Sequence, residues 1–330
     1  MSTRKRPRWN WRAIWIAAGV LLVGAIGFTY YHYRQDVDAA RARIASGSKI
    51  AQTLCGAIEY ADAGSGPAVL VVHGAGGGFD QGLAFGQPLV EAGYRVIAPS
   101  RFGYLRTPLP DDASAMAQAD AHACLLDTLG IARIAATGGS AGAPSVMQFC
   151  LRHPQRCAAM VLFVPMVYTP GAANQTSAHV SPTTEAIIKA VLGSDFIFWA
   201  AITMAPDMVM HRVLATPPAD VHRAPADEQA RMHDVLHAIL PIAERAPGLW
   251  NDGKVAATLT RYDLERIAAP TLIASVENDG FGTYRSARYT AEHIPGARFV
   301  GYPDGGHLWV GHQRELWTEI EGFLRVHRAP

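Results

Sequence analysis

The chain has 330 residues, of which 49% are hydrophobic and 17% are charged, and its formal net charge at pH 7 is +1. This composition is that of an ordinary globular protein. The balanced charge does not indicate a nucleic-acid-binding function, and the sequence has no evident repeat or low-complexity tract that would indicate a solenoid or a disordered protein.

The N-terminal segment predicts a membrane anchor. Residues 1–12 are rich in basic side chains, and residues 13–31 carry no charge. Those nineteen residues would form a helix about 28 Å long, close to the hydrocarbon thickness of a bilayer. We predict a basic cytoplasmic tail (1–12), a single-pass transmembrane helix (13–31) and a linker (32–48), with the remainder on the extracytoplasmic side. A cleaved signal peptide is the alternative interpretation.

The four cysteines leave their oxidation state open. An exported domain could oxidise them. Cys150 and Cys157 lie near a predicted helix end and the turn after it, so a disulfide between them is one possibility. Buried free thiols are the other possibility, and the spacing is not typical of a zinc site.

From residue 68 onward, short apolar runs alternate with helical patterns. The predicted strands span residues 68–74, 94–100, 131–139, 158–165, 270–277 and 297–303. The predicted helices span residues 114–130, 141–154 and 313–327. Apolar strands that alternate with helices predict an α/β fold: a central, mostly parallel sheet with helices on both faces.

This alternation is interrupted between residues 166 and 262. Two helical patterns, residues 184–204 and 227–246, occupy this stretch. We predict a helical cap (166–262) inserted into a core formed by residues 49–165 and 263–330. The cap would lie over the carboxyl ends of the strands, where such sheets bind ligands.

The run Gly138-Gly139-Ser140-Ala141-Gly142 has the pattern G-x-S-x-G between a predicted strand and a predicted helix. In this context the serine sits on a strained turn that exposes its oxygen at the top of the sheet. Side chains at the first and last glycine would collide with neighbouring elements, and the helix N-terminus favours negative charge. We therefore predict that Ser140 is a nucleophile.

A serine nucleophile needs a base, and the base needs an acid to orient it. Asp279 follows one predicted strand and His307 follows the last one, so both lie at the same sheet edge as Ser140. The alternatives are Glu277 and Asp304 for the acid and His312 for the base.

The oxyanion that forms on serine attack needs backbone donors. We predict that the amides of Ala141 and Ala75 supply them, because Ala75 lies in the glycine-rich loop after the first apolar strand. A phosphate-binding loop is not favoured, since neither G-x-G-x-x-G spacing nor a following Lys-Ser/Thr is present.

Three further features allow two interpretations each. His233 and His237 share a helix face, as zinc ligands or as a solvated surface; no third ligand is evident. Asp80 and Arg101 lie in loops at the active edge, where they would contact substrate or stabilise the loops.

The motifs together resemble the α/β-hydrolase superfamily over residues 56–327, in the order and near the spacing usual for that family. This resemblance implies a mostly parallel sheet, a helical cap after the sixth strand, and a Ser140–His307–Asp279 triad. The sequence VENDGFGTY around Asp279 lacks the glycine and proline of the G-x-x-D-x-x-x-P pattern that many relatives have.

We therefore predict a membrane-anchored serine hydrolase without a metal or organic cofactor, whose substrate is a small or medium apolar carboxylic ester. Gly74, Phe79 and Trp199 are the candidate substrate-binding residues, although the apolar residues of the cap could equally form its core. Hydrolysis of a carbon–carbon bond with the same triad is one alternative, and a non-catalytic binding protein is another. Beyond a small molecule and the membrane no partner is predicted, and the oligomeric state is left open.

Overall fold

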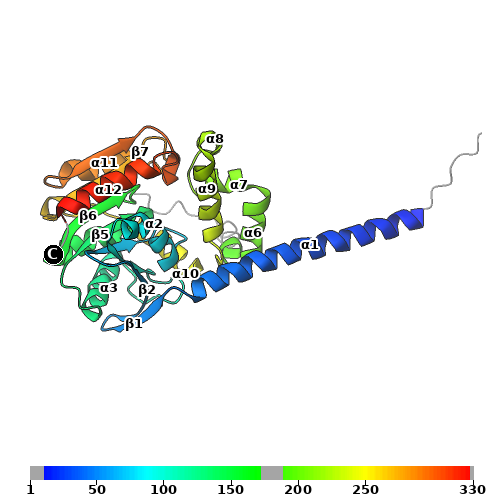
Figure 1. Cartoon of the computed structure of the whole chain (residues 1–330), viewed down its shortest axis with the longest axis horizontal. Coiled ribbons are helices and arrows are strands. Elements are labelled where there is room, and N and C mark those ends of the chain that lie inside the picture. The colour runs from blue at the N-terminus through cyan, green and yellow to red at the C-terminus, as the bar shows by residue number, and fades with distance from the viewer. Residues whose placement is uncertain (1–10, 172–188, 328–330) are drawn as a thin grey trace, which may run out of the picture.

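The computed structural model describes residues 11–171 and 189–327 (Figure 1). An eight-stranded sheet with the order β1-β2-β4-β3-β5-β6-β7-β8 forms the centre of the fold. The strands are β1 (Lys49–Thr53), β2 (Gly56–Ala63), β3 (Ala68–Val72), β4 (Arg95–Pro99), β5 (Ile134–Gly139), β6 (Cys157–Phe163), β7 (Thr271–Val276) and β8 (Arg298–Tyr302). The six predicted strands are confirmed as β3 to β8, which pair in parallel. The antiparallel edge pair β1–β2 was not predicted.

Helices cover both faces of the sheet, as predicted. The helices around the sheet are α2 (Phe79–Glu91), α3 (Ala115–Thr128), α4 (Ala143–Arg152), α11 (Thr283–His293) and α12 (Gln313–His327). Apolar side chains of α3, α4 and α11 pack on one face, and those of α2 and α12 pack on the other. Each face therefore has its own apolar core, and the carboxyl ends of the parallel strands remain available at one edge.

Shorter helices form the cap between β6 and β7. Within the described residues they are α6 (Asp195–Met204), α7 (Pro206–Arg212), α8 (Pro218–Arg223), α9 (Ala226–Ala238) and α10 (Ala246–Ala257). The first predicted cap helix begins outside the described residues and breaks at Gly193, after which Ser194 caps α6. The second one ends at Ala238, because a segment that contains Pro241 separates α9 from α10.

Most of the predicted linker is helical, because residues 32–45 continue the N-terminal helix. This helix, α1 (Trp11–Ala45), is the one described helix that is long and apolar enough to cross a membrane, and its apolar part is exposed. Its C-terminal part has no glycine or proline to end it, and it packs on the cap through Val37 and Ala40 (Figure 1). The predicted basic tail lies largely outside the described residues.

All four cysteines form disulfides. Cys150 and Cys157, at the end of α4 and the start of β6, are joined with a Cα–Cα distance of 5.1 Å. Cys55 and Cys124, which the spacing did not suggest as a pair, join the β1–β2 turn to α3 with a Cα–Cα distance of 6.0 Å. The second disulfide closes a 69-residue separation and ties the edge strands to the core.

Candidate active site

Ser140 lies directly after β5, at the turn into α4. Its φ of 47° is in the left-handed region, which a non-glycine residue rarely adopts. A Cβ at Gly138 would lie 3.0 Å from Val146, and one at Gly142 would lie 2.6 Å from the carbonyl oxygen of His73. The two glycines therefore permit the sharp turn, and helix α4 begins two residues later than predicted, after a 3₁₀ turn.

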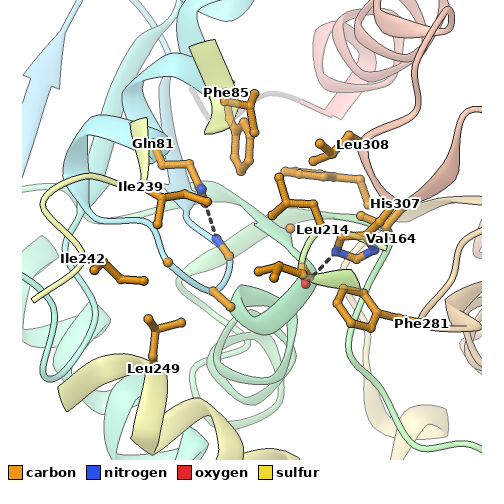
Figure 2. A pocket seen from close by; sticks show the side chains of 18 of the residues that line it. Gln81, Phe85, Val164, Leu214, Ile239, Ile242, Leu249, Phe281, His307 and Leu308 are labelled. Atoms are coloured by element: carbon orange, nitrogen blue, oxygen red, sulfur yellow. Dashed lines mark hydrogen bonds between the residues drawn. The ribbon is translucent and has the colours of Figure 1, made fainter. Parts of the chain in front are cut away.

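His307 and Asp279 come together with Ser140 at this edge. The imidazole Nε2 of His307 is 2.9 Å from Oγ of Ser140, and its Nδ1 is 2.9 Å from Oδ2 of Asp279. Figure 2 shows His307 with its dashed bond to the serine oxygen. Asp279 follows β7 and His307 follows β8, so adjacent parallel strands present the acid and the base on the same side of the sheet.

Hydrogen bonds keep the carboxylate of Asp279 ionised. Burial alone raises the pKa of Asp279, but hydrogen bonds from His307, from the Thr283 hydroxyl and from the Phe281 amide outweigh burial and lower that pKa. An ionised Asp279 accepts a hydrogen bond from the Nδ1–H of His307, which leaves Nε2 as an acceptor for the Ser140 hydroxyl. The sequence around Asp279 did not indicate that the Thr283 hydroxyl would donate to this carboxylate.

The rival residues lie elsewhere. Glu277 is exposed, and Asp304 pairs with His312 at 2.9 Å on the surface. The cap fixes the loop that carries His307. The amide of His307 donates to the carbonyl oxygen of Ala215, and the amide of Leu308 donates to the Thr216 hydroxyl at 3.1 Å. No local pattern in the sequence indicated this contact between the cap and the loop.

The two predicted oxyanion donors lie beside the serine. Ala75 and Ala141 line the same cavity as Ser140. The amide of Gly74 donates to Oε1 of Gln81 at 2.9 Å, so it is already occupied (Figure 2). The next amide along the loop is that of Ala75, which lines both cavities together with Ser140.

An apolar cavity of about 210 Å³ adjoins Ser140 under the cap (Figure 2). Side chains from both core and cap line it, among them Phe85, Phe163, Phe198, Leu214, Val235 and Ile239. Of the predicted substrate-binding residues, Gly74 lies in this lining. Phe79 does not, because its ring is buried in the core beneath α2. Trp199 packs against α1 instead, where its Nε1 donates to Asp36 at 2.7 Å.

A second cavity of about 510 Å³ meets the first at Ser140 and His307. Tyr168 from the segment after β6 and Asp252 from α10 contribute to its lining. Within the described residues, neither lining contains a Lys or Arg side chain. The described part of the site therefore offers hydroxyl groups and apolar surface and contains no Lys or Arg.

The remaining candidates are engaged in structural contacts. Asp80 is buried and pairs with Arg245 at 2.7 Å, and Arg101 pairs with Asp252 at 2.5 Å. Both side chains stabilise loops at the active edge and are not part of the described lining of either cavity. His233 and His237 stack on each other along α9, with ring centroids 4.2 Å apart.

Comparison with known proteins identifies the family of this fold. The sequence model of the family described as "alpha/beta hydrolase fold" matches residues 67–310. An uncharacterized hydrolase of Bacillus subtilis, YcgS, is 26% identical over 82% of this chain and 95% of its own. A 2-hydroxy-6-oxononadienedioate/2-hydroxy-6-oxononatrienedioate hydrolase of Paraburkholderia xenovorans is 29% identical over 68% of this chain and 75% of its own.

A solved structure is also similar. The α/β-hydrolase fold protein from Nakamurella multipartita has a TM-score of 0.67 and 26% identity, over 84% of this chain and 99% of its own. The family match covers the strands that carry Ser140, Asp279 and His307. The chain therefore belongs to the α/β-hydrolase fold family.

Proposed function

We propose that this protein is a serine hydrolase that cleaves carboxylic esters with an apolar acyl group. The observation that carries the proposal is the continuous line of hydrogen bonds from Asp279 through His307 to Ser140, beside an apolar cavity. A serine hydroxyl is a weak nucleophile alone, and this arrangement activates it.

The proposed reaction has two halves. Ser140 attacks the ester carbonyl while Nε2 of His307 takes its proton, and the Ala75 and Ala141 amides stabilise the oxyanion. His307 then protonates the departing alkoxide. A water molecule, deprotonated by His307, hydrolyses the acyl-enzyme and restores the serine hydroxyl.

The cavity linings favour an ester over a dienoate. Two proteins similar to this chain, one from Comamonas testosteroni and one from Paraburkholderia xenovorans, are named as hydrolases of dienoates or dioates, which carry carboxylates. Buried charges in proteins are normally paired, and the described linings contain no Lys or Arg that could pair with a carboxylate. Carbon–carbon bond hydrolysis with the same triad is the second candidate, supported by the names of these relatives.

We further propose that α1 anchors the protein in a membrane, with the catalytic domain on the extracytoplasmic side. The exposed apolar part of α1 and the basic residues before it support an anchor. Phe196, Ile197 and Met204 are also exposed on α6, the cap helix beside α1, and Met208 is exposed on the next helix, α7 (Figure 1). The two disulfides fit an oxidising compartment. A cleaved signal sequence would also contain such a helix, and detection of residues 13–31 in the mature protein by mass spectrometry distinguishes the two.

Labelling with a fluorophosphonate probe tests the nucleophile. We expect the full-length protein and Ser46→Ala, a change at an exposed serine, to be labelled, and Ser140→Ala not to be. Equal labelling of Ser140→Ala, or no labelling of the wild type, would contradict the proposal and favour a non-catalytic binding protein. Turnover of a nitrophenyl ester and of 2-hydroxy-6-oxo-6-phenylhexa-2,4-dienoate by the same preparation then separates ester hydrolysis from carbon–carbon bond hydrolysis.

A further inference from the structure

The orientation of one peptide group decides whether the oxyanion site exists. In a trans peptide, the C=O of one residue and the N–H of the next point in opposite directions. The carbonyl of Gly74 and the amide of Ala75 belong to the same peptide group. Whatever fixes the Gly74 carbonyl away from Ser140 therefore fixes the Ala75 N–H toward it, and a flipped peptide would present an oxygen to the oxyanion.

Two buried side chains bind that carbonyl. Nη2 of Arg101 donates to the Gly74 oxygen at 3.0 Å, and Nδ1 of His73 lies 2.7 Å from the same oxygen. Nε2 of His73 accepts the backbone N–H of Arg101 at 2.9 Å, so Nδ1 carries the proton and donates it. Burial, and next the charge of Arg101, lower the pKa of His73 well below its usual value, and the ring stays neutral in this tautomer.

The guanidinium of Arg101 is held in turn by the cap. Asp252, on α10, accepts from its Nη1 at 2.5 Å and from its Nη2 at 2.8 Å, a two-pronged contact that fixes the plane of the guanidinium. The hydroxyl of Tyr104 also donates to Asp252, and it accepts the N–H of Gly76 at 3.2 Å. Arg101, Tyr104 and Asp252 are 6%, 0% and 7% exposed.

Stability alone does not account for this arrangement. A buried ion pair costs desolvation, and a well-packed apolar replacement often matches its contribution to stability. Here the two side chains that bind Asp252 also bind the glycine-rich loop. Arg101 donates to the carbonyls of His73 and Gly74, and the Tyr104 hydroxyl accepts from the amide of Gly76. The network thus fixes the loop on both sides of Ala75.

We propose that Arg101, Tyr104 and Asp252 are positioning residues that hold the Ala75 N–H toward the oxyanion, so that the seating of cap helix α10 controls the competence of the site. This inference rests on the proposed serine-hydrolase function. It assigns to Arg101 a role that the sequence left open. It also makes the cap a part of the catalytic scaffold as well as a cover for the substrate.

The test compares Asp252→Asn and Tyr104→Phe with the wild type in the full-length protein. Asp62→Asn is the matched control, because Asp62 binds Arg95 in the same two-pronged way, at 2.9 Å for both contacts. Arg95 lies at the start of β4 beside the first residue of β3, whereas the loop follows the last residue of β3. For the two test variants we expect kcat on a nitrophenyl ester to fall by at least about 10-fold, up to the roughly 100- to 1,000-fold of a lost oxyanion donor, with little change in KM. For Asp62→Asn we expect an unchanged kcat.

The inhibition constant of an alkyl trifluoromethyl ketone distinguishes a positioning role from a merely structural one, because a merely structural role would leave this constant unchanged. Addition of the Ser140 oxygen to its carbonyl, with transfer of the serine proton to His307, gives a hemiketal whose oxyanion needs the same donors as the transition state. We expect its inhibition constant to rise in Asp252→Asn and Tyr104→Phe by the same factor as kcat/KM falls. Melting temperatures, measured in parallel, identify any variant that is unfolded.

The outcomes separate the two claims. If the wild type is active and either folded variant retains full affinity for the ketone, the positioning role is wrong and the proposed hydrolase function still stands. A wild type that neither hydrolyses the ester nor binds the ketone overturns the proposed function, and the positioning role with it. If Asp252→Asn does not fold, Tyr104→Phe decides the question, because it removes the contact to Gly76 without leaving a charge unpaired.

Discussion

The apolar cavity beside Ser140 makes the proposed acyl preference measurable. Each buried methylene contributes about 0.8 kcal/mol, which corresponds to roughly fourfold in kcat/KM at 25 °C. We therefore expect kcat/KM for nitrophenyl esters to rise by about that factor for each added methylene until the acyl chain fills the 210 Å³ cavity, and then to level off. The measurement is a series of nitrophenyl esters from acetate upward, assayed below the concentration at which they form micelles.

Substitution of Val235 by Phe narrows the same cavity. Val235 lies on α9 and lines the cavity, so a larger ring there occupies space that the acyl chain would use. We expect the plateau to move to shorter esters, with a loss of roughly fourfold for each methylene that no longer fits, while the acetate ester is hydrolysed as by the wild type. The same change at Val326, which is 76% exposed on α12, is the control.

Two results would refute this reasoning. A wild-type profile that is flat or falls from acetate onward would show that the acyl group does not enter the apolar cavity. A Val235→Phe profile identical to the wild type would show that productive substrates bind elsewhere, for example through the second cavity. In either case the assignment of the apolar cavity to the acyl chain fails, although the triad could still be functional.

Three further predictions follow from individual contacts. Asp279→Asn should lower kcat by about four orders of magnitude, because an amide favours the wrong tautomer of His307; a loss below about 10-fold in steady-state assays contradicts the triad. Burial lowers the pKa of His312, but hydrogen bonds to two carboxylates outweigh it and raise that pKa, so its contribution to stability is complete below about pH 6.5 and is lost as the pH rises through the folded-state pKa. In urea titrations His312→Gln should therefore cost more at pH 6 than at pH 9, and an equal cost would refute this sign. Replacing both Cys55 and Cys124 by Ser should cost about 4 kcal/mol of unfolding free energy, from the 69-residue separation that they close, and a cost near zero in the same titration would contradict it.

The parallel strands and the residues that follow them were predictable because their signals are local. A strand buried on both faces is a continuous apolar run, and the chemistry of this fold comes directly after such runs. Strand β1 gives no such run: it is a short edge strand of largely exposed residues, and its neighbour β2 contains Glu59, a fully buried carboxylate. A charged residue usually indicates a loop, so a strand that contains one is missed unless its partners are known. The partners of Glu59 are Arg106 and Ser100, which come from a distant part of the chain.

The residues that line the apolar cavity were harder to predict, for a physical reason. Aromatic side chains indicate burial but do not say against what. Helix α6 is apolar around most of its circumference, so its sequence could not show that Phe198 turns toward the cavity while Trp199 packs on α1. Phe79 begins α2 and belongs to the same buried cluster as Ile44, at the end of α1, so its surroundings depend on the path of the N-terminal helix.

The contacts that hold the oxyanion loop lie beyond local patterns altogether. Arg101 and Asp252 are 151 residues apart, and Asp80 and Arg245 are 165 apart, so each pair joins the core to the inserted cap. Neither pair belongs to a motif, because Asp252 lies on α10 and Arg245 directly before it, and the position of this helix against the core is set by packing. The sequence thus indicates which groups reach the edge of the sheet, whereas the fit of the cap determines how the loop beside them is oriented. In a hydrolase built this way, cap variation that changes substrate preference must also preserve Asp252 and Arg245 as supports of the loop, and that constraint can be tested by transplanting caps with and without them.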